Sequence, residues 1–523
     1  MSNLTYVYDI ECYRNYFLVM FVDVNTLQPF YWELHNDIYP WPVVAPSQDT
    51  LIGFNSKNYD HPMLSLALQG ASNRQLKACS DEIILGGVKF WQHNFDLYEA
   101  NRHIDIIEVL PGVANLKIYG GRIGSKKLQD LPIEPDAHIS YDDAAMLREY
   151  CYNDCIVTKE LYDKVKPQLD LRAKLGQKYH LDLMSKSDAQ IAEAVITSEY
   201  RQRTGRDVQK PSSTKLIGTA FRYQPPPFIK FDTPDMQALL ELIKQTDFVV
   251  GDKGAIKLPP QLNNKIVTVA DKKYKMGIGG LHSVDKPGSF YADDDTVLVD
   301  IDVTSYYPAI ILNCQYAPSQ MADQFLTIYQ SIVDQRLEAK KSGDKVTADS
   351  LKITVNGSFG KLGNRYSKLY SPQLLIHVTL TGQLALLMLI ESLQGTVISA
   401  NTDGITLRYV SCFVSNNPGI KDAVKQWEAL TGFNMEWTPY KSLHRKDVNN
   451  YLAITPDGKT KNKGIFTPGG LNKNPTNEVV IKAVIEYLLN GTPPDQFIRR
   501  HKIVKDFTTI RTVAGGALKN GIR

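Results

Sequence analysis

The sequence predicts a multidomain protein of mixed α/β and α+β class. Its 523 residues exceed the usual size of one domain, so about two to four domains with separate cores are expected. Runs of β-branched and aromatic residues alternate with segments of helical periodicity, which indicates sheets covered by helices. Charge is divided unevenly, with 14 Lys and Arg against 23 Asp and Glu in residues 1–170, and 15 against 6 in residues 441–523. An acidic first domain suits a metal site, and a basic C-terminal segment suits nucleic acid or is a solvated surface.

Composition narrows the class of protein without naming a function. Hydrophobic residues make up 43% and charged residues 22%, as in ordinary globular proteins. The longest apolar run, Leu384–Ile390, is far shorter than the roughly 20 residues of a membrane span, and the N-terminus lacks a basic-then-apolar leader. We therefore expect no membrane association and a cytoplasmic location. The cysteines contain no C-x-x-C pair and predict reduced thiols, without a disulfide framework or zinc site: Cys12, Cys79, Cys151, Cys155, Cys314 and Cys412.

Two strands open the chain, at Leu4–Ile10 and Tyr16–Val24, because both runs are rich in β-branched and aromatic residues. Apolar positions recur at helical spacing over residues 141–165, so an amphipathic helix is expected to close the first domain near residue 170. A second helix is expected over about 187–204. Proline-rich sequence at 223–228 cannot continue a helix and indicates a connector.

The second half begins with a strand at Val297–Asp302, which ends on an acidic residue. A helix with Ser319 as its N-cap is predicted to run to Ser342, and a second helical segment follows it as a hairpin. Two strands with a tight turn between them are expected at 396–400 and 405–410, and one more helix near 476–490.

The first candidate site starts from Asp9 and Glu11. These carboxylates are two residues apart on a predicted strand and therefore share a face, where together they could hold a divalent metal. Taken alone, the pair is more typical of a solvated strand face than of a metal site.

Two further motifs strengthen this site. Asn55 and Asp60 follow an apolar run at 51–54, and Tyr150 and Asp154 lie one turn apart on the predicted helix. Four acids that can converge, with a phenol to orient a water, suit hydrolysis of a phosphodiester by two metals.

This ordered set resembles the three exonuclease motifs of proofreading 3′–5′ exonucleases with the RNase-H-like fold, over about residues 1–170. The resemblance implies Tyr150 as the residue that orients water, Asn55 as a contact to the DNA strand, and either Lys126 or Lys127 as support for the departing phosphate. Asp105 has no motif around it and is expected to be structural. The implied metal ligands are Asp9, Glu11, Asp60 and Asp154.

The second candidate site starts from Asp302, which is followed by Ser305-Tyr306-Tyr307-Pro308. Further on come Lys352-x-x-x-Asn356-Gly357-Ser358-Phe359-Gly360 and then Asn401-Thr402-Asp403-Gly404. This order resembles motifs A, B and C of family B DNA polymerases: D-x-x-S-L-Y-P, K-x-x-x-N-S-x-Y-G and D-T-D-S. With the exonuclease motifs, the resemblance implies a phage-type DNA polymerase that carries its own proofreading domain.

The resemblance also implies roles for individual residues. Two Mg²⁺ per site, with Mn²⁺ as a possible substitute, would bind the oxygen ligands Asp302, Asp403 and the carbonyl of Val303. The triphosphate would meet Arg336, Lys340 and Lys352, which fall on the two helices of the predicted hairpin. Asn356 and Phe359 would line the incoming base pair, and Tyr307 would pack under the sugar and exclude a 2′-hydroxyl.

Two weaker elements are implied as DNA contacts. Gly277-Ile278-Gly279-Gly280 resembles the Y-x-G-G element, where Gly279 and Gly280 would approach the template strand. Lys461 and Lys463 resemble the basic loop that follows the primer phosphates.

The resemblance gives the chain a right-hand polymerase after its exonuclease domain. Primer–template DNA and dNTPs are the expected partners of a monomer, with replication accessory proteins as possible further partners. The 50 residues between Asp302 and Lys352 accommodate only a helical hairpin, which favours nucleic-acid over protein priming. The implied domains are exonuclease 1–170, connector and palm-associated region 171–296, palm 297–318, fingers 319–361, palm 362–460 and thumb 461–523.

The sequence departs from the family pattern at several positions. Asn401 replaces the first acid of D-T-D-S, Gly357 and Phe359 replace Ser and Tyr in motif B, and Asn449-Asn450-Tyr451 stands for K-x-Y. Residues 353–360 have strand propensity, and only the resemblance makes them helical. Two alternatives stay open: an exonuclease whose polymerase half only binds DNA, and a non-catalytic nucleic-acid-binding replication protein.

Overall fold

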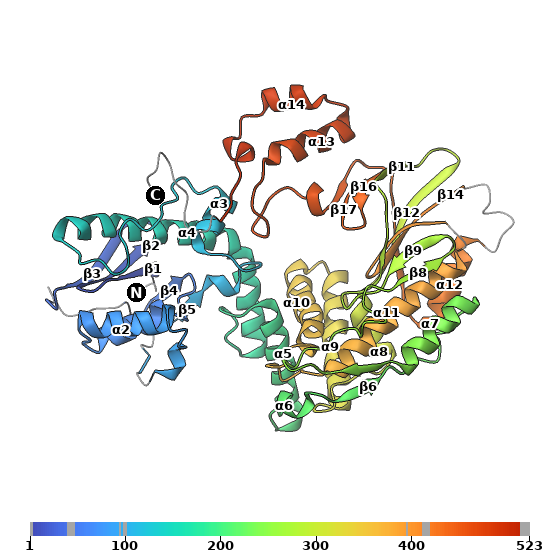
Figure 1. The fold of residues 1–523 in the computed structure, drawn as a ribbon, viewed down its shortest axis with the longest axis horizontal. Coiled ribbons are helices and arrows are strands. Elements are labelled where there is room, and N and C mark those ends of the chain that lie inside the picture. The colour runs from blue at the N-terminus through green and yellow to red at the C-terminus, as the bar shows by residue number, and fades with distance from the viewer. Residues whose placement is uncertain are drawn as a thin grey trace. The chain divides into compact units, whose positions relative to one another are not determined.

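The computed structural model describes residues 4–38, 46, 48–93, 96–97, 102–393, 396–410 and 419–512. The chain forms two compact units, each with its own sheet and helices (Figure 1). Unit 1 comprises Met1–Ser187, Gly469–Val480 and Arg500–Arg523, and unit 2 comprises Asp188–Pro468 and Ile481–Arg499. Helices and strands occur in both units, so the mixed α/β multidomain class is confirmed.

Unit 1 is built on a five-stranded sheet with strand order β3-β2-β1-β4-β5. The strands β1, β2 and β3 are antiparallel, whereas β4 and β5 extend the sheet in parallel on the other side of β1. Both strands predicted at the start of the chain are therefore confirmed, as β1 and β2. The bounds are β1 Thr5–Cys12, β2 Tyr16–Asp23, β3 Pro29–His35, β4 Thr50–Gly53 and β5 Arg102–Asp105.

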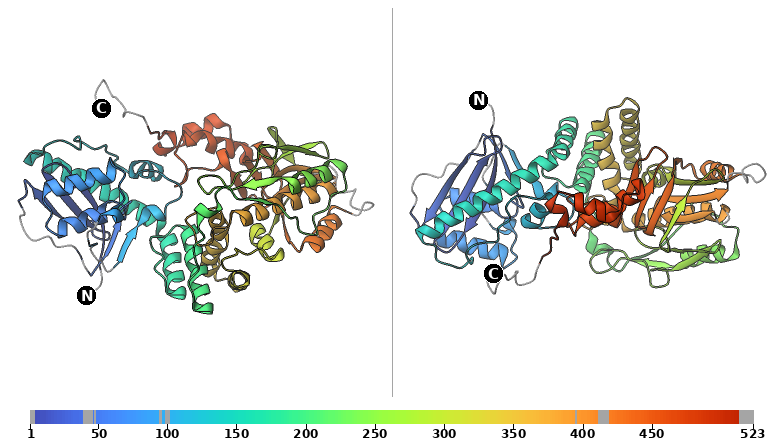
Figure 2. Two further views of the ribbon diagram at one scale, coloured as in Figure 1. Left: turned by 60° about the horizontal axis from the view of Figure 1, so that its bottom comes forward. Right: turned by 90° about the horizontal axis from the view of Figure 1, so that it is seen from above.

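Helices cover both faces of this sheet (Figures 1 and 2). On one face, α3 (Leu116–Ile123) and α4 (Tyr141–Tyr179) share a core with Val7 of β1. On the other face, α1 (Asp60–Leu68) and α2 (Asn73–Ile84) pack on Tyr8 and Ile10. Because side chains alternate along a strand, Asp9 and Glu11 fall on the α4 face, with Val7.

The helix α4 is longer than its sequence pattern predicts. It was expected over residues 141–165 and continues to Tyr179, through Pro167. Proline removes one helical hydrogen bond, but Val165 and Leu169 are buried in the same core on either side of it. Packing therefore carries the helix past the break that the sequence suggests.

The C-terminal part of the chain contributes to unit 1. Arg122 of α3 donates to the carbonyl of Leu471 at 2.7 Å and to Oδ1 of Asn474 at 2.8 Å. The amide of Asn477 donates to the carbonyl of Thr508 at 2.9 Å. Two segments of the stretch 461–523 thus belong with the first 187 residues, and the treatment of that stretch as a single thumb domain stays a prediction.

Unit 2 contains a seven-stranded sheet of order β15-β12-β14-β13-β10-β9-β8, with β12 between β14 and β15. Unit 2 also contains a four-stranded sheet of order β11-β16-β17-β18 and the two-stranded sheet β6-β7. The strands of the large sheet are β8 Ile266–Val269, β9 Lys272–Lys275, β10 His282–Ser283, β12 Thr296–Val303, β13 Val397–Asn401, β14 Gly404–Val410 and β15 Met435–Pro439. The others are β6 Ala220–Arg222, β7 Asp247–Val249, β11 Gly288–Tyr291, β16 Ser442–Asp447, β17 Asn450–Ile454 and β18 Thr460–Lys463.

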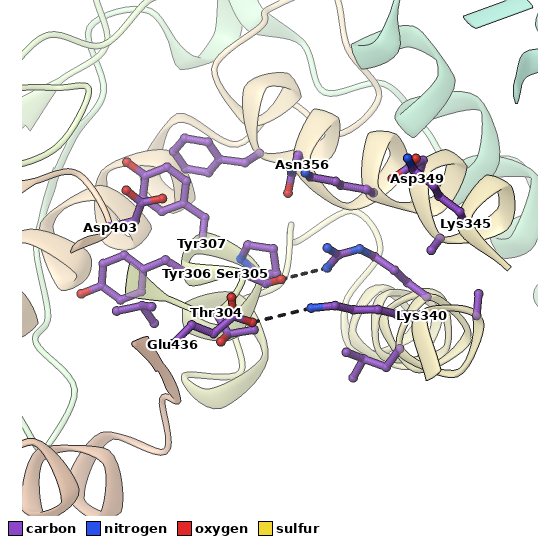
Figure 3. A pocket seen from close by; sticks show the side chains of 18 of the residues that line it. Thr304, Ser305, Tyr306, Tyr307, Lys340, Lys345, Asp349, Asn356, Asp403 and Glu436 are labelled. Atoms are coloured by element: carbon purple, nitrogen blue, oxygen red, sulfur yellow. Dashed lines mark hydrogen bonds and ion pairs between the residues drawn. The ribbon is translucent and has the colours of Figure 1, made fainter. Parts of the chain in front are cut away.

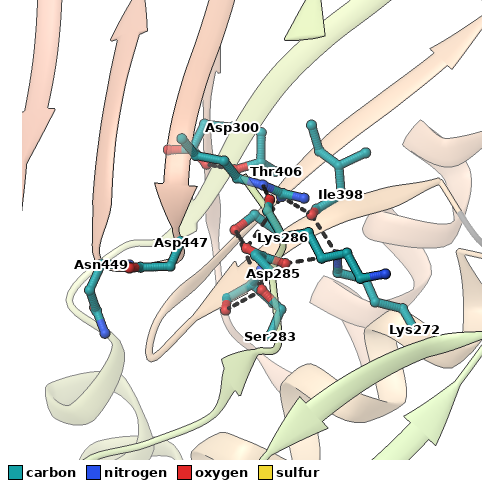
Figure 4. Close-up of polar contacts among 12 residues, drawn as sticks. Lys272, Ser283, Asp285, Lys286, Asp300, Ile398, Thr406, Asp447 and Asn449 are labelled. Atoms are coloured by element: carbon teal, nitrogen blue, oxygen red, sulfur yellow. Dashed lines mark hydrogen bonds and ion pairs between the residues drawn. The ribbon is translucent and has the colours of Figure 1, made fainter. Parts of the chain in front are cut away.

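The buried carboxylate of Asp285 ties the two larger sheets together (Figure 4). Its side chain is fully buried and pairs with Lys272 of β9 at 2.9 Å and with Arg445 of β16 at 3.2 Å. Ser399 of β13 donates to the same carboxylate at 2.6 Å. Two cations thus pair with one buried carboxylate, and this network links the two sheets.

The predicted helical hairpin is formed by α9 (Asp323–Lys341) and α10 (Lys345–Leu362). The first helix begins four residues after Ser319, and Ala322 is its N-cap residue. The predicted helix at 187–204 is present as α5 (Asp188–Thr204) and packs along α10 (Figure 2). The remaining helices of the chain are α6 Ser213–Leu216, α7 Pro234–Gln245, α8 Tyr306–Asn313, α11 Pro372–Ser392, α12 Ile420–Thr431, α13 Glu478–Asn490 and α14 Pro494–Arg500.

Residues 353–360 are helical, against their strand propensity, because tertiary packing fixes them in α10. Val355 is fully buried, and its carbonyl accepts a hydrogen bond from the hydroxyl of Tyr329 at 2.9 Å. Gly357 faces α5, where an added Cβ would lie 2.8 Å from the carbonyl oxygen of Asp188 and 3.0 Å from the Cβ of Ala192. The glycine in the second motif therefore permits close helix packing.

Within the part of the chain that the structure describes, only α11 is long and apolar enough to cross a membrane, and 89% of its apolar window is buried in the protein. Five cysteines are present as free thiols, and Cys412 lies outside the described residues.

Candidate active sites

Unit 1 brings the predicted exonuclease carboxylates of β1 next to α4, and Asp60 interacts with Asp9 from the start of α1. Asp9, Glu11 and Cys151 can each offer a ligand atom within 4.8 Å of the others. Asp60 begins α1 and Asp154 lies on α4, and these two carboxylates are 5% and 6% exposed. The geometry thus joins residues from β1, α1 and α4 in one buried acidic cluster.

Burial and mutual repulsion make ionisation of the acids in this cluster unfavourable. Burial and the neighbouring Asp154 raise the pKa of Asp9 to about 7. Burial also raises the pKa values of Glu11, Asp60 and Asp154, and the charge of Asp9 adds to the effect at Glu11 and Asp60. Carboxylate oxygens in such a group are ligands that suit Mg²⁺, so the donor set fits a divalent cation.

Lys117 is the cation that the structure places at the cluster, and sequence reasoning missed it. Its ammonium group donates to both carboxylate oxygens of Asp154 and lies 4.5 Å above the centre of the Tyr150 ring. Lys117 comes from α3, outside all three motifs. Lys117 lies five residues before Arg122 on α3, the helix that the C-terminal segments contact. Nothing in its sequence position indicates that it pairs with the acidic cluster.

The other predicted residues of unit 1 occupy different surroundings. Asn55 is exposed with φ 59°, and its amide donates to the carboxylate of Asp105 at 2.8 Å. Asp105 is fully buried and also accepts from the amide of Lys57 at 2.9 Å, so it anchors the loop that carries Asn55. Lys126 and Lys127 are both exposed, and Lys127 pairs with Glu149 at 2.8 Å. Their role at a phosphate stays a prediction.

The raised pKa of Asp9 predicts a pH-dependent stability in the absence of metal. The carboxyl group ionises near 3.9 in an unfolded chain and near 7 in the folded one, so the folded protein binds the additional proton in between. This contribution is fully present below about pH 4 and is lost as the pH rises through about 7. In EDTA, Asp9→Asn should therefore gain on the order of 2 kcal/mol relative to the parent between pH 5 and pH 8. Calorimetric melting of both proteins across this range measures the difference, and parallel curves would contradict it.

Unit 2 contains a cavity of about 650 Å³ that collects residues from all three polymerase-like motifs (Figure 3). Val303 and Tyr307 come from the first motif, Thr402 and Asp403 from the third. The cavity is also lined by side chains of α9 and α10. The predicted nucleotide-site residues in its lining are Val303, Tyr307, Arg336, Lys340, Lys352, Asn356, Phe359 and Asp403.

Helical spacing explains why the hairpin faces the cavity with cations. Arg336 and Lys340 are one turn apart on α9, and Lys345, Asp349 and Lys352 follow one face of α10. Figure 3 shows Lys340 extending from α9 towards Glu436, with Lys345, Asp349 and Asn356 on α10. The cavity therefore has a positive wall opposite the carboxylate of Asp403.

Arg336 and Lys340 also contact the opposite wall. Arg336 donates to the hydroxyl of Ser305 at 2.9 Å, and Lys340 lies 3.7 Å from a carboxylate oxygen of Glu436 on β15. Ser305 has φ 50°, an unusual conformation for a residue with a side chain, at the point where β12 turns into α8. These contacts orient the α9 cations across the cavity.

Two aromatic rings form a third side of the unit 2 cavity. The rings of Tyr307 and Phe359 stack with centroids 4.1 Å apart and an interplanar angle of 24°. The hydroxyl of Tyr307 donates to the carbonyl of Gly279 at 3.4 Å, and the hydroxyl of Thr402 donates to the same atom at 3.4 Å. Gly280 has φ 121°, and a Cβ there would lie 2.9 Å from Cγ2 of Thr402. The two glycines thus abut Tyr307 and Thr402, and their contact with a template strand stays a prediction.

The two candidate metal-binding acids lie at the ends of paired strands. Asp302 of β12 is opposite Gly404 of β14, one residue after Asp403. The amide of Val303 donates to the carbonyl of Asp403 at 2.7 Å, which holds the turn against the end of β12. Burial, then the nearby Asp300, raises the pKa of Asp302 to about 6, and burial raises that of Asp403. These oxygens fit a hard divalent cation.

Gly404 leaves room for the Asp302 carboxylate. A Cβ at position 404 would overlap Oδ1 of Asp302. The departure from serine at this position therefore accompanies a close approach of the two strands.

Lys461 lies at these acids in the described structure. Its ammonium group is 2.9 Å from Oδ2 of Asp300 and 3.1 Å from Oδ2 of Asp302. Lys463, two residues on, lies 5.9 Å from the centre of the Tyr451 ring. Both lysines sit on β18, a strand paired with β17, where the sequence suggested a loop. Sequence reasoning also missed Asp300, whose position before Asp302 on a strand gives no separate motif.

Comparisons with known proteins give a likeness in structure only. No family model matches the chain, and no curated protein matches it in sequence. The chain matches the structure of the family B DNA polymerase from the hyperthermophilic archaeon Pyrobaculum calidifontis, with 15% sequence identity and a TM-score of 0.45. The match covers 96% of this chain and 64% of that polymerase, so this chain spans less than two thirds of its length.

Proposed function

We propose that the chain is a phage-type family B DNA polymerase that extends a primer on a DNA template and proofreads with a 3′–5′ exonuclease. The observation that carries the proposal is the 650 Å³ cavity of unit 2, where residues of all three motifs meet across a cationic helical hairpin. In this proposal the motif-bearing strands β12, β13 and β14 form the palm, and α9 and α10 form the fingers.

The chain's own residues divide the work of synthesis. Arg336, Lys340 and Lys352 would bind the triphosphate, because guanidinium and ammonium groups on a rigid hairpin suit phosphate oxygens. Phe359 and Asn356 would contact the incoming base pair from α10, and Tyr307 would support the sugar. Asp302 and Asp403 would hold two Mg²⁺, which supply Lewis-acid stabilisation of the attacking and leaving oxygens when bound.

Proofreading is assigned to the acidic cluster of unit 1. Asp9, Glu11, Asp60 and Asp154 would hold divalent metal, and Tyr150 would orient the attacking water. Burial and the charge of Asp154 raise the pKa of Tyr150, so the phenol keeps its proton at neutral pH and can donate a hydrogen bond. Lys117 would hold the Asp154 carboxylate in place beside Tyr150.

An extension assay with a labelled primer on a DNA template separates the three functional classes. With Mg²⁺ and all four dNTPs, the proposed enzyme lengthens the primer, and without dNTPs it shortens the 3′ end. Shortening in both conditions would identify a nuclease whose second unit only binds DNA. A non-catalytic binding protein would retard the primer in a native gel and would change its length in neither condition.

The alternative of a degenerate polymerase half rests on Asn401 and Asn449, where acidic and basic residues are expected. The geometry supports a working polymerase half, since Asp403 and Lys352 line one cavity and Asp302 pairs with Gly404, the residue after Asp403.

Tyr307→Ala is expected to relax sugar selection. The ring is held between Phe359 and the carbonyl of Gly279, so it forms a rigid floor that a 2′-hydroxyl would meet. The ratio of kcat/KM for a dNTP to that for its ribonucleotide should fall by about 100-fold, roughly 3 kcal/mol of discrimination. Single-nucleotide incorporation in an Asp9→Ala background measures this ratio without proofreading.

Tyr307→Phe is the matched control for this prediction. It keeps the ring and its stacking and removes only the long hydrogen bond to Gly279, so the ratio should stay near that of the parent. An unchanged ratio in Tyr307→Ala would show that the ring packs elsewhere in the working complex. A loss of both activities together with a lowered melting temperature would identify an ordinary core aromatic.

A further inference from the structure

Asp300 is a buried acid next to the candidate metal ligands that no motif includes. It lies two residues before Asp302 on β12, on the same face of the strand, and is 7% exposed. Thr406 of β14 donates to its Oδ1 at 2.8 Å, and Tyr440 donates to its Oδ2 at 2.8 Å. Figure 4 shows Asp300 and Thr406 side by side. Donors on two separate elements therefore fix this carboxylate in place.

Lys461 joins Asp300 to Asp302. Its ammonium group contacts Oδ2 of both carboxylates, at 2.9 Å and 3.1 Å. The side chain of Asp300 is 9% exposed, against 36% for Asp302 and 45% for Lys461. Of the three charged groups, Asp300 is therefore the buried and fixed one, and Asp302 is the carboxylate that stays accessible.

The two oxygens of Asp302 have different surroundings. Oδ2 meets Lys461, and Oδ1 lies over Gly404, where any side chain would overlap it. The carboxylate is therefore oriented by a cation on one side and by a bare backbone on the other. A lysine that paired with Asp302 alone would be a direct competitor for any metal at this acid.

We propose that Asp300 is a positioning residue of the polymerase site, which holds Lys461 so that this lysine orients the Asp302 carboxylate without neutralising it. Asp300 pairs with the ammonium group of Lys461 and so keeps this group to one side of the Asp302 carboxylate. Asp302 then remains able to bind a divalent cation. This inference rests on the proposed polymerase function and assigns a role that the departure at Asn401 leaves open.

Asn401 supports this assignment through its location. Asp300, Asn401, Gly404 and Tyr440 line one small cavity beside the metal-binding acids. Motif C of the family that the chain resembles starts with an acid, and this chain has the amide Asn401 at that position. Asp300 of β12 lies across the same cavity, so the neighbouring strand supplies the negative charge of this region.

The test measures metal binding and activity in whole-chain variants that also carry Asp9→Ala and Glu11→Ala, so that unit 1 contributes little. Mn²⁺ binding is followed by electron paramagnetic resonance, and primer extension is measured over a range of Mg²⁺ concentrations. Asp300→Asn should weaken Mn²⁺ binding about 10- to 100-fold, as loss of a residue that supports a metal ligand commonly does. It should raise the Mg²⁺ needed for half-maximal extension by a similar factor, while saturating Mg²⁺ restores kcat.

The double variant Asp300→Asn with Lys461→Met decides the mechanism. Without the lysine, nothing competes for Asp302, so Mn²⁺ affinity should return to within about threefold of the parent. An Asp300 that served only to stabilise the fold would give a double variant no better than Asp300→Asn, with a lowered melting temperature and a kcat that Mg²⁺ does not restore. That result would overturn the inference.

Lys459→Met is the matched control for charge. Lys459 precedes β18 in the same hairpin, is exposed, and pairs with Asp457 at 2.6 Å. Mn²⁺ affinity should stay within about twofold of the parent, and a change as large as the one that Lys461→Met produces when it is added to Asp300→Asn would overturn the inference in favour of general electrostatics. A parent that neither binds Mn²⁺ nor extends a primer overturns the proposed function itself. If the parent does both, and Asp300→Asn has the same Mn²⁺ affinity and Mg²⁺ dependence as the parent, only the role of Asp300 is overturned.

Discussion

Asp403→Ala is expected to stop primer extension while the protein still shortens single-stranded 3′ ends. Asp403 lines the unit 2 cavity, and burial raises the pKa of its carboxyl. In the proposed mechanism Asp403 holds metal, so its loss should lower the rate of nucleotide addition by about 1,000-fold or more, roughly 4 kcal/mol of transition-state stabilisation. Single-turnover extension and 3′-end degradation, measured on the same preparation, give the two rates.

Asp457→Ala serves as the control for this variant. Asp457 is an acid in the turn after β17, hydrogen-bonded to Thr455, and it lies outside the cavity lining. Its removal should change extension less than twofold. Extension that persists in Asp403→Ala would place the metal-binding acids elsewhere. A loss of both activities from a folded protein would show that the two units do not act independently.

The strands that carry the acids are predictable from sequence because alternation along a strand is a local property. Asp9 and Glu11 share a face of β1, and the buried residues Tyr8 and Ile10 occupy the other. The strand β12 carries Asp302 as its second-last residue, after a largely apolar run. Short sequence windows thus identify both strands, and the motifs that follow identify the chemistry.

The helical faces of the hairpin are also local. Arg336 and Lys340 are four residues apart, and Lys352, Asn356 and Phe359 continue the spacing on α10. Residues 353–360 differ, because their own propensity is for strand and only the resemblance predicts the helix that the structure contains. Burial of Val355 and the contact of Gly357 with α5 override that propensity, since tertiary packing outweighs preferences of a few tenths of a kcal/mol.

The lysines at the two acidic sites could not be predicted, because their partners are remote in sequence. Lys117 reaches Asp154 from another helix, and Lys461 reaches Asp300 and Asp302 from another sheet. Neither contact leaves a spacing pattern, so only the folded chain shows that each acidic site holds an internal cation. Lys461 in particular was expected to face DNA phosphates, and the structure places it between two carboxylates.

Asp9→Ala with Glu11→Ala is expected to abolish degradation of single-stranded 3′ ends and to leave primer extension largely intact. The two side chains lie on one face of β1, and burial raises the pKa of both carboxyl groups, with the charge of Asp154 on α4 adding to the effect. Removing both takes two oxygen ligands from the cluster, so degradation should fall by about 1,000-fold or more.

Asp163→Ala is the control for the loss of an acid from unit 1. Asp163 lies on α4 like Asp154, but it is exposed and pairs with Lys159 at 2.7 Å. This variant should degrade 3′ ends at nearly the rate of the parent. The double variant and Asp403→Ala are then reciprocal, because the acids of β1 belong to unit 1 and those of β12 and its neighbours belong to unit 2. Extension that vanished from a folded Asp9→Ala/Glu11→Ala protein would mean that one set of acids serves both reactions, and the assignment of two active sites would be wrong.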